Sequence, residues 1–230
     1  MIFDFKFWHY FARQGDLIHN LHETTMQKFN RRLAWIFAFG LLLFAVREIW
    51  GMNTASLTPY LANGLWSDYT LARWTSLLGT LLWGGIYMAF HTYGVAYLFM
   101  LLTKMRFRPA LVIQSYVLAL LLIEKALLFL VFAVAGYTMP VSLFSFGPLA
   151  ATFLDMPFLT FFFNQLTVFT ALIIAFQYRF VRSFTEVAPK KLLFVLILVY
   201  VLVALAIAGL SYVPIGEMLG DFTRGGASVE

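Results

Sequence analysis

Three pairs of polar residues interrupt long apolar stretches of the sequence, and their side chains have the clearest capacity for chemistry. The pairs are Arg47-Glu48, Glu124-Lys125 and Asn164-Gln165. Each lies about 14 to 15 residues from the basic end of the apolar stretch that carries it, or about 21 to 23 Å deep at 1.5 Å per residue. A hydrocarbon layer about 30 Å thick would place all three at one level, where charges need partners. We therefore predict an intramembrane polar layer.

Complementary charges within this layer suggest specific ion pairs. Arg47 could meet Glu124 while Glu48 meets Lys125, which would offset the cost of burying four charges. Alternatively, Arg47 and Glu48 cap the outer end of their helix and Lys125 extends outward along its own methylenes. A glutamate stem is too short for such an escape, so we favour the ion-paired layer. Whether the layer is structural or lines a path for an ion, a peptide or a lipid head group stays open.

Histidines offer a second possible chemistry. His91 lies within an apolar stretch, where a histidine is either a hydrogen-bonded packing residue or a possible polar site. His19, His22 and Glu23 lack the His-Glu-x-x-His spacing of zinc proteases, so we interpret both histidines as surface residues and expect no metal. A metal site completed by His9 or by a partner is the alternative.

Catalytic and nucleotide motifs are missing from the sequence. It has no Gly-x-Ser-x-Gly elbow, phosphate-binding loop or dinucleotide fingerprint, and it has no cysteine. We expect neither an enzyme nor a cofactor, and an ATPase role is excluded as far as motifs can exclude it.

Composition places the chain among polytopic membrane proteins. Of its 230 residues, 62% are hydrophobic and only 12% are charged, with a mean hydropathy of +0.83. The pattern predicts an all-α bundle of five transmembrane helices, forming a membrane domain over residues 33–213. A cytoplasmic or interfacial segment, 1–32, precedes this domain and a short outer tail, 214–230, follows it. The predicted spans are 33–50, 75–102, 106–134, 158–180 and 191–213. The broken apolar segment 136–157 is expected to be an interfacial or partly re-entrant loop.

Basic residues predict the orientation of these spans. With the amino terminus in the cytoplasm, the cytoplasmic segments hold twelve Lys and Arg residues, whereas the outer segments hold only Arg73 and Arg224. Lys and Arg concentrate on the cytoplasmic side of membrane proteins. The net charge of +5 therefore reflects topology rather than nucleic-acid binding, and the carboxyl terminus is expected outside.

The amino-terminal segment allows two interpretations. Its aromatic residues alternate with Lys6 and Arg13, which suits an interfacial helix lying on anionic lipid. Equally, it could be a cytoplasmic tail that packs on the helix bundle. Its early charges do not fit a cleavable signal peptide.

Small residues mark two possible helix-contact faces. Gly84 and Gly85 lie in the second predicted span, and Ala204 and Ala208 in the fifth. Small side chains let helix backbones approach closely, either within the monomer or against a partner.

The last hundred residues resemble the YIP (Ypt-interacting protein) family of five-span membrane proteins, in its bacterial branch. The likeness lies in Phe158-Leu-Thr-Phe-Phe-Phe-Asn-Gln-Leu-Thr-Val-Phe-Thr-Ala-Leu, the basic turn from Arg179 to Arg182, and Ala188-Pro-Lys-Lys-Leu-Leu. The long amino-terminal segment and the Glu124-Lys125 pair depart from it. The resemblance implies a non-enzymatic role in membrane organisation and partner binding, in some bacteria beside an ABC exporter that protects against toxic peptides.

Two functions follow as hypotheses. The first is an accessory or assembly protein of the bacterial inner membrane, surrounded by the lipid bilayer and bound to membrane partners such as ABC exporter subunits. The second is a small transporter whose polar layer carries its substrate. Partner, substrate and oligomeric state are left open.

Overall fold

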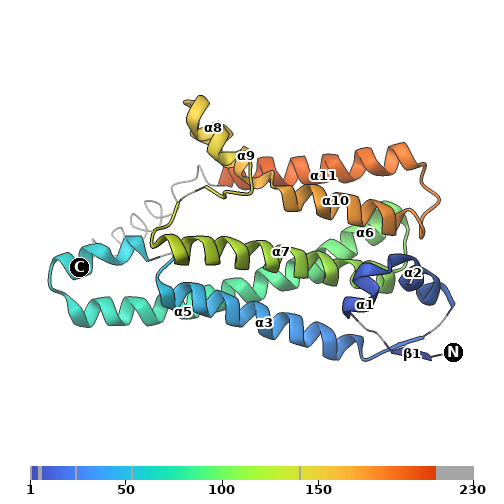
Figure 1. Ribbon diagram of the computed structural model, residues 1–230, viewed down its shortest axis with the longest axis horizontal. Helices are drawn as coiled ribbons and strands as arrows, with labels where there is room; N and C mark the ends of the chain where they lie inside the picture. The colour runs from blue at the N-terminus through green and yellow to red at the C-terminus, as the bar shows by residue number, and fades with distance from the viewer. Residues whose placement is uncertain (1, 5–6, 24, 53, 140, 211–230) are drawn as a thin grey trace, which may run out of the picture. The chain divides into compact units, whose positions relative to one another are not determined.

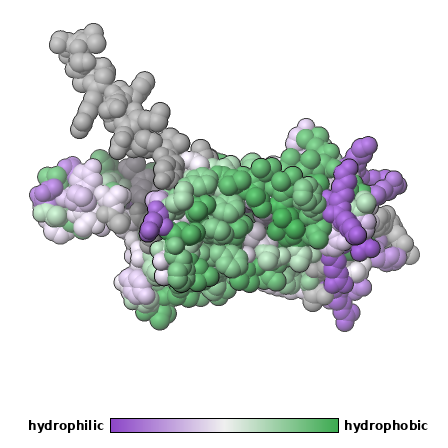
Figure 2. Space-filling model, turned by 90° about the horizontal axis from the view of Figure 1, so that it is seen from above, coloured by the Kyte–Doolittle hydropathy of each residue, from purple (hydrophilic) through white to green (hydrophobic). Residues whose placement is uncertain are grey.

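Helices dominate the computed structural model, which describes residues 2–4, 7–23, 25–52, 54–139 and 141–210 (Figure 1). Four of these helices are long and apolar enough to cross a membrane: Phe29–Trp50, Trp66–Thr103, Phe107–Ala135 and Pro189–Gly209. Figure 2 shows that hydrophobic residues make up most of the coloured surface on the face in view. The coarse prediction of a multi-pass helical membrane protein is thus confirmed.

The chain divides into two compact units. The first comprises Met1–Thr138 and Ala175–Leu192, and the second Met139–Ile174 and Leu193–Glu230. The first unit therefore holds three of the four long apolar stretches and the whole described amino-terminal segment.

Three helical stretches form the body of the first unit. Helix α3 (Phe29–Trp50) packs against α5 (Trp66–Ala89) and against α7 (Phe107–Ala135) (Figure 1). Helix α5 continues through a π-helix, η2 (Phe90–Gly94), into α6 (Val95–Thr103), which also contacts α7. Two short helical elements connect α3 to α5: η1 (Ala55–Leu57) and α4 (Thr58–Ala62).

Glycines allow close contact within this body. A Cβ atom at Gly40 of α3 would overlap Met88 of α5 and crowd Leu122 of α7. A Cβ atom at Gly84 of α5 would lie 2.8 Å from the Phe44 ring of α3. A side chain at either position would force the neighbouring side chain to move. Gly84 therefore serves contact within the chain, and a partner is not needed to explain it.

The amino-terminal segment packs on the bundle, as one of the two interpretations predicts. Strands β1 (Ile2–Asp4) and β2 (Thr25–Gln27) pair in parallel. In the sequence, α1 (Phe7–Ala12) and α2 (Gln14–Glu23) connect the two strands. Leu17 of α2 is fully buried, in a cluster with Phe29, Tyr116 and Phe180. The Tyr116 ring of α7 stacks on Phe7 at 4.4 Å between centroids, and its hydroxyl donates to the Phe7 carbonyl at 3.1 Å.

The helix predicted over residues 158–180 is wrong as a continuous element. The structure instead forms α9 (Pro157–Gln165) and α10 (Val168–Val181), separated by Leu166 and Thr167. The Thr167 hydroxyl accepts the Thr170 N–H at 3.0 Å, which is the bond that caps a helix amino terminus. The Thr167 segment also forms an antiparallel bridge with Ser145, and the Val168 N–H donates to the Phe144 carbonyl. A local cap and an isolated backbone bridge thus replace one turn of helix.

Other boundaries differ in part from the prediction: the second span, predicted at 75–102, begins at Trp66, and the segment 136–157, predicted as a loop, contains a helix. Helix α8 (Gly147–Phe153) interrupts the broken segment before α9, and α11 (Pro189–Leu210) is the last described helix. Pro157 and Pro189 each occupy the first helical position, where the missing N–H costs no hydrogen bond. The predicted outer tail, 214–230, lies outside the described residues.

Candidate functional site: an intramembrane polar cluster

Five of the predicted site residues belong to the first unit and to helices that pack on one another. Arg47 and Glu48 lie near the end of α3, His91 lies in η2, and Glu124 and Lys125 lie in α7. Ser76, Thr80 and Tyr87 of α5 contact members of this set. We define the polar cluster by these side chains: Arg47, Glu48, Ser76, Thr80, Tyr87, His91, Glu124 and Lys125.

Glu48 is the most enclosed member of the polar cluster. Its side chain is 1% exposed, and both carboxylate oxygens accept hydrogen bonds from hydroxyls of α5. Ser76 Oγ donates to Oε1 at 2.6 Å, and Thr80 Oγ1 donates to Oε2 at 3.2 Å. Because Ser76 and Thr80 are four residues apart, their side chains lie on the same face of α5. The two donors join α5 to α3 through a buried carboxylate.

Arg47 spreads over the end of α3. Its Nε donates to the Met52 sulfur at 3.2 Å, and its guanidinium carbon lies 5.9 Å from the centre of the Phe44 ring. Arg73 of α5 donates to the Ile49 carbonyl at 3.0 Å. Cations at a helix carboxyl terminus complement the partial negative charge of the last carbonyls. The guanidinium contact to a carbonyl at this end is made by Arg73, so the choice between a cap and an ion pair for Arg47 stays open.

Lys125 lies over an aromatic ring. Its Nζ is 4.9 Å from the centre of the Tyr87 ring, within the range of cation–π attraction, and it interacts electrostatically with Arg47 and Glu124. The opposite charge on Glu124, which is 8% exposed, partly compensates Lys125. The His91 ring lies 4.4 Å from the same Tyr87 ring. Tyr87 therefore joins η2 and α7 within the polar cluster.

These contacts do not establish the two predicted ion pairs. The two hydroxyl bonds of Glu48 are made by α5, and the pairings of Glu48 with Lys125 and of Arg47 with Glu124 stay predictions. Asn164 and Gln165 belong to the second unit, so their membership of the layer also stays a prediction. Within that unit, Asn164 Oδ1 accepts the Ser142 N–H at 2.6 Å and the Ser145 hydroxyl at 3.0 Å, which fixes the turn before α8. The Gln165 carbonyl accepts the Thr170 hydroxyl at 3.1 Å.

Several polar residues of the first unit escaped the sequence analysis. Ser76 and Thr80 were detectable as hydroxyls at helical spacing inside an apolar stretch. Gln114 of α7 and Thr92 of η2 are fully buried, and neither amide atom of Gln114 nor the Thr92 hydroxyl has a hydrogen-bond partner among the described residues. A glutamine inside an apolar stretch is itself a signal, because an unbonded buried amide is costly.

The predicted helix-contact residues have different surroundings. Gly84 lies against Phe44, whereas a Cβ atom at Gly85 would meet nothing within 4 Å. Ala204 and Ala208 of α11 are 3% and 0% exposed. Contact of those two alanines with another protein stays a prediction.

In the described part of the chain, no group of three or more metal-ligating side chains occurs. His19 lies in α2, whereas the side chains of His22 and Glu23 are outside the described set. Comparisons with protein-family models, with curated proteins and with solved structures find no match to this chain.

Proposed function

We propose that the protein is an accessory or assembly subunit of a bacterial inner membrane that acts through other membrane proteins, with an ABC exporter as the first candidate partner. The observation that carries this proposal is the enclosure of Glu48, which is 1% exposed and whose two oxygens each accept a hydrogen bond, from Ser76 and from Thr80. A buried carboxylate bound by hydroxyls of its own protein suits a structural role better than a passage for solute. The resemblance to the YIP family supports the same function.

The outward face of α5 is the proposed contact surface. Gly79 and Gly85 both have open space where a Cβ atom would lie, and the neighbouring Leu82 and Ile86 are 69% and 61% exposed. Small residues beside large apolar ones let a second helix approach closely in a membrane.

Photocrosslinking tests this surface directly. A photoreactive residue at Leu82 is expected to give a discrete crosslink to one membrane protein in living cells, identified by mass spectrometry. The same residue at Met88, which is fully buried on the same helix, is expected to give none. Gly79→Leu is expected to reduce recovery of that partner at least severalfold without changing the unfolding temperature, because no atom of the described residues lies within 4 Å of a Cβ atom at Gly79. Crosslinking to lipid alone would contradict the proposal.

A transporter is the second candidate, and one observation favours it. The π-helix η2 carries His91 into the polar cluster beside Tyr87, and π-helical turns are frequent at functional sites. Purified protein in liposomes that moved a solute unaided would establish this function in place of the first.

Five spans with a cytoplasmic amino terminus are part of the same proposal, with α9 and α10 together making the fourth crossing. The cysteine-free chain allows a direct test with single cysteines and a membrane-impermeant maleimide on intact cells. We expect labelling at Asn63→Cys, Thr152→Cys and Ser228→Cys, and protection at Gly15→Cys and Ser183→Cys. Labelling of Gly15→Cys with protection of Asn63→Cys would invert the topology, and labelling of Ser183→Cys with protection of Ser228→Cys would remove the fourth crossing.

A further inference from the structure

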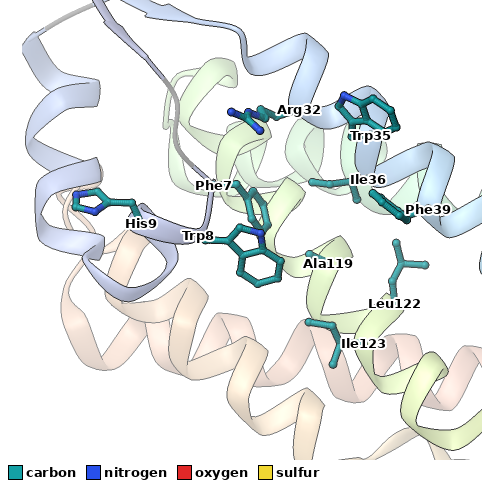
Figure 3. A pocket seen from close by; sticks show the side chains of 10 residues that line it. All are labelled: Phe7, Trp8, His9, Arg32, Trp35, Ile36, Phe39, Ala119, Leu122 and Ile123. Carbon is teal, nitrogen blue, oxygen red and sulfur yellow. The ribbon is translucent and has the colours of Figure 1, made fainter. Parts of the chain in front are cut away.

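A cavity of about 790 Å³ lies between α1, α3 and α7 of the first unit (Figure 3). Its size falls within the range of small-molecule sites in proteins. The walls are almost entirely apolar, with Phe7 and Trp8 from α1, Ile36 and Phe39 from α3, and Leu122 and Ile123 from α7. This cavity is separate from the polar cluster and has no part in the proposed function.

One end of the cavity carries a positive charge. Arg32 lies there, one turn into α3, with its side chain at the cavity wall (Figure 3). Among the described residues, no carboxylate lies within 4.0 Å of the Arg32 guanidinium. His9 also lines this region, but it faces Asp16 of α2 at 4.0 Å. The guanidinium is thus the group available to an anion.

The cavity is open toward the surroundings of the helices. Trp8, Trp35 and Phe39 are 72%, 55% and 64% exposed. From Arg32 to Phe39 the cavity follows α3 for about 10 Å at the rise of an α-helix. It therefore begins among the basic residues that precede the apolar part of α3 and extends into the depth occupied by acyl chains. Exposed tryptophans at the polar end suit the boundary between lipid head groups and hydrocarbon.

From this combination we infer that the cavity binds an anionic phospholipid, with its phosphate at Arg32 and one acyl chain between α3 and α7. The apolar walls exclude a hydrophilic anion such as free phosphate from most of the volume. The charge at one end selects an anionic head group over a zwitterionic one. The site requires only that α3 lies in a membrane, so it holds for an accessory protein and for a transporter alike.

Native mass spectrometry of the full-length protein, released from nanodiscs of phosphatidylcholine with phosphatidylglycerol, tests the site. We expect one retained phosphatidylglycerol on the wild type, and about a fivefold loss of its preference over phosphatidylcholine in Arg32→Gln. Arg31→Gln is the matched control, since it removes the same charge from an exposed neighbour that does not line the cavity. It is expected to retain the lipid.

A variant whose side chain fills the cavity provides a second test of lipid binding. Ala119 lines the cavity, and Ala119→Phe is expected to abolish retention of both lipids while the unfolding temperature in detergent stays within a few degrees of the wild type. If that variant does not fold, the comparison of Arg32→Gln with Arg31→Gln decides alone. Equal losses in these two variants would show diffuse attraction to a basic surface and would overturn the site. So would retention of free oleate without phosphatidylglycerol.

Discussion

Replacing Glu48 by Gln should lower the free energy of unfolding by about 3 kcal/mol, the size expected when one member of a buried charged group is removed. Glutamine keeps the volume of the side chain and one acceptor for Ser76 or Thr80, so no cavity forms. The loss arises because Arg47 and Lys125 remain in the cluster with one negative charge fewer. Reversible SDS titration in mixed micelles measures it.

Asp68→Asn provides the matched control for the Glu48 variant. It removes the same charge from an exposed position in the first turn of α5, where a surface carboxylate contributes only about 0.3 to 1 kcal/mol. Ser76→Ala should cost about 1.5 to 3 kcal/mol, and less when Glu48 is already Gln, because contacting residues do not contribute additively. Equal effects of Glu48→Gln and Asp68→Asn would rule out a buried, charge-compensating role for Glu48.

Replacing Tyr116 by Ala should detach the amino-terminal segment and destabilise the protein by about 3 to 5 kcal/mol, as for other large-to-small changes in a core. Tyr116 is fully buried, stacks on Phe7, and packs against Phe176 at 5.7 Å between centroids. Limited trypsin digestion at Arg13, which lies exposed between α1 and α2, should become at least tenfold faster. A tenfold increase corresponds to a decrease of about 1.4 kcal/mol in the free energy of local opening.

Tyr116→Phe separates the hydrogen bond from the packing. It removes only the bond from the hydroxyl to the Phe7 carbonyl and should cost about 0.5 to 1.5 kcal/mol, with little change in digestion at Arg13. Unchanged digestion in Tyr116→Ala would mean that the segment is held by other contacts, such as the burial of Leu17.

Long apolar helices were the most predictable part of the fold. The helix expected over 106–134 is observed as Phe107–Ala135, because a proline in the first turn and about 25 apolar residues leave little alternative. The break at Thr167 was not predicted, since a Thr-x-x-Thr cap has no distinct signature inside an apolar run. The number of crossings and their orientation rest on the basic residues and stay predictions.

The sequence predicted several residues of the candidate site but not the direction of their contacts, and their common depth in the membrane stays a prediction. Counting residues along each helix indicates how deep Glu48 and Lys125 lie, and the structure places both in the body of the first unit. Depth carries no information about the side of the helix from which a partner comes. Glu48 bonds to Ser76 and Thr80 because α5 is the neighbour on that side, whereas Lys125 lies over Tyr87. Such choices depend on helix rotation, which glycines such as Gly40 and Gly84 help to fix.

The lengths of the helices in the first unit determine how the protein would respond to bilayer thickness. Helix α3, with 22 residues, is about 33 Å long and matches an average hydrocarbon layer, whereas the stretch Trp66–Thr103, with 38 residues, is about 57 Å long. The excess can be absorbed by tilt or by protrusion of the first turns of α5, which carry Ser67, Asp68 and Arg73. The longer helix can therefore tolerate membranes of different thickness, and the shorter one sets the thickness at which hydrophobic mismatch begins.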